Sequence, residues 1–208
     1  MVWSSAVAKR DFMQNGEHSS LKKVAEIRLS MFKLNLFAIP TSMLIFIFYL
    51  VTYFLLMPRD PKLLSRFEML GVAFIFVAIV FSHELLHALA LLIWGKVSRS
   101  DIKFGVNKKH RIPYTHTDVP VKLWVYRRVA IFPLIVLGLP WTLVLILIPR
   151  YWIALCAAWA VSGSMGDIFI WFKTCGYSKE FIVQGPPDGL EIDLYGEENQ
   201  HSGQAESD

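Results

Sequence analysis

Five consecutive residues, His83-Glu84-Leu85-Leu86-His87, combine two metal-binding side chains with a carboxylate that can act as a base. In an α-helix, residues i and i+4 lie on one face, so both imidazoles can reach one metal ion. A glutamate beside such a pair is the usual base of zinc-dependent hydrolysis. The spacing therefore predicts a zinc site with His83 and His87 as ligands and Glu84 as the catalytic residue. The structural alternative is that these side chains only hydrogen-bond neighbouring helices.

The motif lies in an apolar stretch, residues 69–94, within a chain that is 54% apolar with a mean hydropathy of +0.43. Crossing a ~30 Å hydrocarbon layer takes about 20 apolar residues. Four segments meet this requirement: residues 34–57, 69–94, 129–148 and 151–172. We therefore expect an all-α polytopic membrane protein with four transmembrane helices and a short cytoplasmic β-hairpin. Ionisable side chains inside such helices are expensive, by about 2.5–3.5 kcal/mol each, which favours a functional role for the motif.

A hydrolytic zinc site normally has three protein ligands and one open position. Within the predicted spans, Asp167 is the only acidic residue besides Glu84. At a rise of ~1.5 Å per residue, His87 lies roughly 10 Å from the predicted cytoplasmic end of its span, and Asp167 lies slightly under 10 Å from the end of its own. Asp167 is therefore the candidate third ligand, and the alternative is a helix-end carboxylate that reaches cytoplasmic water. The small residues Ser162, Gly163, Ser164 and Gly166 predict close approach of a neighbouring helix.

Basic residues predict the orientation. Lysines and arginines are concentrated before the first span and between the second and third, so both termini and the middle segment are expected in the cytoplasm. Because these charges flank apolar spans, no nucleic-acid binding is expected. The predicted organisation is a polar N-terminal cytoplasmic segment (1–33), a four-span membrane domain (34–173) and a C-terminal tail (174–208). The acidic, Gly- and Ser-containing end of that tail predicts disorder from about residue 188.

The middle segment carries a hairpin pattern. Residues 101–106 alternate polar and apolar, Asn107-Lys108-Lys109 resembles a turn, and residues 111–115 can form the returning strand. The exposed edge of such a hairpin could receive an unwound substrate as an added strand. His110 and His116 are expected to be solvated loop residues. In the third span, Pro133 and Pro140 predict kinks.

Three segments together resemble the DUF3267 group of zincin peptidases, a mostly bacterial family similar in layout to site-2 proteases. They are HELLH at 83–87, the stretch from Asp118-Val119-Pro120 to Tyr126–Pro133, and SGSMGD at 162–167. The resemblance covers roughly residues 69–172 and implies His83, His87 and Asp167 as ligands of one Zn²⁺ ion, with Glu84 catalytic. It also implies location in a bacterial cytoplasmic membrane. Site-2 proteases place their aspartate before glycine, whereas here Gly166 precedes Asp167.

The expected function is therefore zinc-dependent cleavage of membrane-spanning substrates near the cytoplasmic side of the lipid bilayer. Zinc-bound water with a pKa lowered toward ~7 would lose its proton to Glu84. The expected partners are the bilayer and a membrane-protein substrate, and the sequence does not specify an oligomeric state. Two alternatives remain open, a catalytically idle membrane scaffold and a metal or proton transporter.

Overall fold

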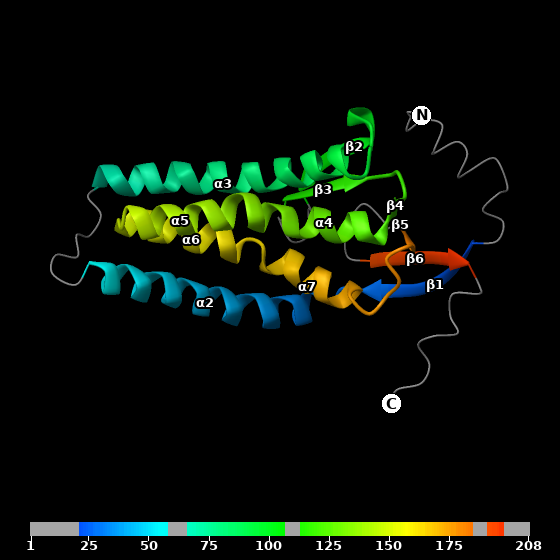
Figure 1. The fold of residues 1–208 in the computed structure, drawn as a ribbon, viewed down its shortest axis with the longest axis horizontal. Coiled ribbons are helices and arrows are strands. Elements are labelled where there is room, and N and C mark those ends of the chain that lie inside the picture. Colours follow the sequence, from blue (N-terminus) through cyan, green and yellow to red (C-terminus); the bar gives the residue numbers. More distant parts are fainter. Residues whose placement is uncertain (1–20, 58–65, 107–112, 185–190, 198–208) are drawn as a thin grey trace. The chain divides into compact units, whose positions relative to one another are not determined.

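A computed structural model describes residues 21–57, 66–106, 113–184 and 191–197 of the 208-residue chain (Figure 1). The chain divides into two compact units whose segments alternate along the sequence. We call Met31–His87 together with Val129–Phe172 the helical unit. The strand unit consists of Met1–Ser30, Ala88–Arg128 and Lys173–Asp208. Each unit is described by itself below.

The described residues contain four helical segments that are long and apolar enough to cross a membrane, as the sequence predicts. Two are single helices, α2 (Met31–Leu56) and α3 (Arg66–Ile93). The third combines α4 (Leu123–Pro133), the π-helix η2 (Leu134–Gly138) and α5 (Leu139–Leu147), and the fourth combines α6 (Tyr151–Ser162) and α7 (Met165–Thr174). The third segment begins six residues before the predicted span, because the polar Tyr126-Arg127-Arg128 lowers hydropathy without interrupting the helix.

Small side chains of α6 form the centre of the helical unit. Ala154, Ala157 and Ala158 are fully buried and pack with Tyr53 of α2 and Leu145 of α5. Small residues let helix backbones approach closely, which is the usual way that apolar helices associate in lipid.

The α6–α7 break is local in origin. Gly163 and Ser164 form a turn in which the Ser164 amide donates to the Val161 carbonyl at 3.1 Å. Glycine and serine are weak helix formers, which favours an interruption at this point. The predicted close approach at Gly166 is wrong, since a Cβ added there would meet no described atom within 4 Å. At Gly163 an added Cβ would meet only the Trp159 carbonyl of its own helix, at 3.1 Å.

The strand unit corrects the all-α prediction. It contains a four-stranded antiparallel sheet in the order β1-β6-β5-β4. The strands are β1 (Leu21–Arg28), β4 (Val121–Lys122), β5 (Ile182–Gln184) and β6 (Glu191–Glu197). The prediction of disorder from about residue 188 is wrong for β6. Ile192 and Leu194 alternate with polar residues and are buried, a period-2 pattern that the acidic composition concealed.

The predicted hairpin is confirmed as the antiparallel pair of β2 (Ile102–Val106) and β3 (Pro113–Thr117). Its register pairs Ile102 with Thr117 and Val106 with Pro113. The predicted turn at Asn107-Lys108-Lys109 lies outside the described residues, as do His110 and the chain beyond residue 197.

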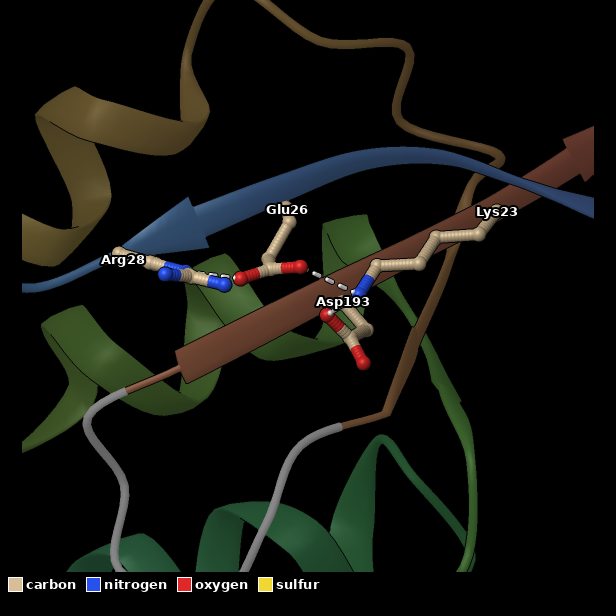
Figure 2. Close-up of polar contacts among 4 residues, drawn as sticks. All are labelled: Lys23, Glu26, Arg28 and Asp193. Atoms are coloured by element: carbon tan, nitrogen blue, oxygen red, sulfur yellow. Dashed lines mark hydrogen bonds and ion pairs between the residues drawn. The ribbon is translucent and has the colours of Figure 1, made fainter.

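Ionic side chains join β1 to β6 (Figure 2). Glu26 lies directly opposite Asp193 in the register, and two carboxylates so placed would repel each other. The Lys23 ammonium lies 2.7 Å from the Glu26 Oε2 atom and 2.7 Å from the Asp193 Oδ1 atom, and Arg28 also bonds Glu26. The hydrogen bond from Lys23, with that from Arg28, lowers the pKa of Glu26 from 4.5 to about 2.

We predict that Lys23→Ala raises the pKa of Glu26 toward its ordinary value, because the Glu26 carboxylate then loses its first donor. Because its pKa is lowered in the folded chain, ionised Glu26 stabilises the paired strands above about pH 4.5. This stabilisation is lost as the pH falls toward 2 and the carboxylate becomes protonated. An NMR titration of the Glu26 side chain in detergent measures the change. Lys22→Ala on the same strand is the control and should leave the Glu26 midpoint in place; a midpoint that also stays in place for Lys23→Ala contradicts the assignment.

Candidate metal centre

Helix α3 places both motif histidines on one face. The His83 and His87 ring centroids lie 4.7 Å apart, and their Nε2 atoms are separated by 3.1 Å. Their side chains are only 13% and 12% exposed. Phe74, Phe81 and Leu85 of the same helix are 76%, 72% and 63% exposed. The helix therefore turns its polar residues inward and an apolar face outward.

Asp167 joins the two histidines from the third residue of α7. Its Oδ2 atom lies 3.0 Å from the His83 Nε2 atom, and its Oδ1 atom lies 3.5 Å from the His87 Nε2 atom. All three residues belong to the helical unit, and the Asp167 side chain is 19% exposed. The structure thus brings together the three residues that the sequence predicts as ligands.

A main-chain contact fixes the proton on His87. The His87 Nδ1 atom lies 3.0 Å from the Val129 carbonyl oxygen. A carbonyl only accepts hydrogen bonds, so Nδ1 must carry the proton. In the neutral ring the Nε2 atom is then an unprotonated acceptor. Its lone pair faces the Asp167 carboxylate, and two acceptors in this position favour a proton or a metal ion between them.

The arrangement of these donor atoms fits a zinc ion. Atoms bound tetrahedrally to zinc at about 2.0–2.1 Å lie about 3.3 Å from one another. The His83 Nε2 atom lies 3.1 Å from the His87 Nε2 atom and 3.0 Å from the Asp167 Oδ2 atom, and the His87 Nε2 atom lies 3.5 Å from the other carboxylate oxygen, Oδ1. Two imidazoles and one carboxylate are also a known ligand set of catalytic zinc. The residues present can therefore hold this metal without a large rearrangement.

Glu84 lies beside the two histidines. One ligand atom each from His83, Glu84 and His87 lies within 4.8 Å of the others. The Glu84 carboxylate is thus close enough to the two rings either to bind a metal ion or to act on a water molecule beside it.

The other candidate histidines do not join this group among the described residues. His116 lies in β3, where its Nε2 atom is 3.2 Å from the Asp118 Oδ1 atom, and its side chain is 14% exposed. The prediction of a solvated loop residue is therefore wrong for His116, because the residue belongs to a strand and its ring is mostly buried beside Asp118. Lys103 also pairs with Asp118, and the hydrogen bond between them lowers the pKa of Asp118.

The sequence interpretation missed the Val129 carbonyl. A main-chain oxygen has no signature of its own in a sequence, since every residue carries one. The available signal was Pro133, which lies four residues later and has no N–H group to donate.

Comparison with known proteins identifies one family. The family model DUF3267, whose description is "putative zincin peptidase", matches residues 76–181, about half of the chain. The matched region contains His83, Glu84, His87 and Asp167. Searches of curated proteins and of solved structures found no match.

We predict that the purified protein binds one zinc ion and that Asp167→Asn weakens binding by more than about 100-fold, since even outer-shell partners of zinc are worth 10- to 100-fold. Competition with a chromophoric chelator measures the affinity. Asp101→Asn, the same chemical change in the 3₁₀ turn η1 (Arg99–Asp101), is the control and should bind zinc as the unmodified chain does. Equal affinities for the two variants would exclude Asp167 from the ligand set.

Proposed function

The chain belongs to the DUF3267 family of zincin peptidases, and from this premise we propose that it is a zinc-dependent endopeptidase that cleaves membrane-spanning substrates within the bilayer. The observation that carries the proposal is the convergence of His83, His87 and Asp167 inside helices of membrane-spanning length. His83, His87 and Asp167 are the proposed metal ligands, and Glu84 is the proposed catalytic residue.

The surroundings of the motif support a position within the membrane. Helix α3 carries the motif, and the exposed residues of its outward face, among them Phe74 and Phe81, are large and apolar. Such a face is stable against lipid and unfavourable against water. The ligand side chains, at 12–19% exposure, avoid that face. This is the usual arrangement of ionisable residues in membrane helices, which turn toward the protein interior or a polar cavity.

The chemistry of hydrolysis assigns a task to each residue. A zinc ion held by His83, His87 and Asp167 would supply a bound water of lowered pKa and a Lewis acid for the scissile carbonyl. Glu84 accepts a proton from the attacking water and later donates it to the leaving nitrogen, so that its carboxylate is regenerated. Asp167 supplies the negative charge that favours a divalent cation between the two imidazoles. Val129 holds the His87 ring in the orientation that directs its Nε2 atom into the site.

The substrate must expose a peptide bond at this depth. A helical segment hides its carbonyl groups in hydrogen bonds, so local unwinding must precede attack. The absence of described atoms within 4 Å of a Cβ at Gly166, next to Asp167, is consistent with space for an extended segment there. Addition of the substrate to the edge of the β2–β3 hairpin stays a prediction.

The proposed location is a cytoplasmic membrane, with both termini in the cytoplasm. Its support is the distribution of basic residues, which flank the first three spans on the sides assigned to the cytoplasm. With this orientation, the proposed hydrolysis requires water to reach the site from the cytoplasmic side.

We predict that Glu84→Gln retains zinc and lowers cleavage by roughly 10²- to 10⁴-fold, the usual contribution of a general base. Glutamine keeps the size of the side chain but cannot accept the proton. Quantitative membrane proteomics of cells that express each variant should show an intact membrane protein accumulating with Glu84→Gln and its cleavage fragments with the unmodified chain.

Glu68→Gln makes the same change in the first turn of α3 and serves as the matched control. The control should process substrates normally. Identical fragments in cells with Glu84→Gln would remove Glu84 from the role of base. Zinc retention with no substrate accumulating in any variant would favour the scaffold, and zinc flux into vesicles would favour the transporter.

A further inference from the structure

Helix α4 contains a proline at its C-terminal end, and this proline is fully buried in the helical unit. In an α-helix the N–H group of residue i donates to the carbonyl of residue i−4. Position 133 is therefore the regular donor to the Val129 carbonyl, but Pro133 has no N–H group. The carbonyl that accepts from the His87 Nδ1 atom at 3.0 Å is the one that Pro133 leaves without this donor.

This coincidence has a chemical consequence for the ring. A backbone carbonyl that lacks its helical donor in an apolar environment favours any other donor within reach. The His87 Nδ1–H group satisfies this need. Because one nitrogen of a neutral imidazole then carries the proton, the other, Nε2, keeps its lone pair for a metal ion.

We propose that Pro133 is a positioning residue of the metal centre: by withholding an N–H group from the Val129 carbonyl, it holds His87 in the Nδ1–H tautomer with Nε2 directed at His83 and Asp167. The inference rests on the proposed zinc site and adds to it a residue that neither binds metal nor contacts substrate. It also gives Pro133 a role beyond the kink that the sequence predicts.

The second proline of the same span provides a contrast. Pro140 is the second residue of α5, and its side chain is exposed. The residue four positions before it is Val136, which is exposed as well. The two prolines of this span thus have different surroundings. Pro133 is buried, and the carbonyl four residues before it, that of Val129, contacts His87, whereas Pro140 is exposed.

The first test compares Pro133→Ala with Pro140→Ala. Alanine at position 133 supplies an N–H group that competes with His87 for the Val129 carbonyl. Zinc affinity, measured by chelator competition on the full-length chain, should fall by about 10- to 100-fold, as for other outer-shell partners of zinc ligands. Pro140→Ala should bind zinc as tightly as the unmodified chain. Equal affinities for the two variants overturn the inference while the zinc site itself stands.

The second test needs no metal. ¹⁵N NMR of histidine-labelled, zinc-free protein, at a pH where the rings are neutral, distinguishes the protonated from the unprotonated ring nitrogen. We expect the protonated nitrogen of His87 to be Nδ1, and Pro133→Ala to populate the other tautomer. A protonated Nε2 in the unmodified chain overturns the inference. An unmodified chain that shows the Nδ1–H tautomer but binds no zinc refutes the proposed function instead.

Discussion

The candidate site depends on the close approach of the His83 and His87 rings of α3 to the Asp167 carboxylate of α7. The His87 Nε2 atom and the Asp167 carboxylate both present electron pairs to the same small space, 3.5 Å apart. Inside apolar helices such groups are poorly solvated, so the arrangement favours a proton or a cation between them. In the proposed metal centre, one divalent cation would serve all three side chains at once. In the proposed function, the same cation would also activate water for hydrolysis.

Departures from regular helix geometry occur where the site is built. The turn at Gly163 and Ser164 separates α6 from α7, the helix that carries Asp167. Pro133 leaves a carbonyl without its regular donor, and that carbonyl contacts His87. The regular parts of the unit, such as the alanine face of α6, supply packing instead. Local exceptions of this kind are expected at functional sites, since the surrounding structure must hold them in place.

The strand unit illustrates how composition and pattern can point in different directions. The C-terminal residues are acidic and contain glycine, which predicts disorder, yet Ile192 and Leu194 occupy alternate positions and are buried in β6. The strand is stable because β1 and β5 pair with it on either side. Its like charges are tolerated because Lys23 bridges Glu26 and Asp193, a partnership between segments some 170 residues apart in the chain.

Hydropathy and spacing alone determined the four apolar helices, the β2–β3 hairpin and the shared helix face of His83 and His87, because each depends on neighbours within a few residues. The sequence also named Asp167, through the rarity of acidic residues in apolar spans. Only the tertiary structure decided that the Asp167 carboxylate meets both rings, that His116 pairs with Asp118, and that the Val129 carbonyl fixes the His87 proton. These contacts join residues that are distant in sequence or involve main-chain atoms. Local patterns carry no record of them, since they are set by how helices and strands pack.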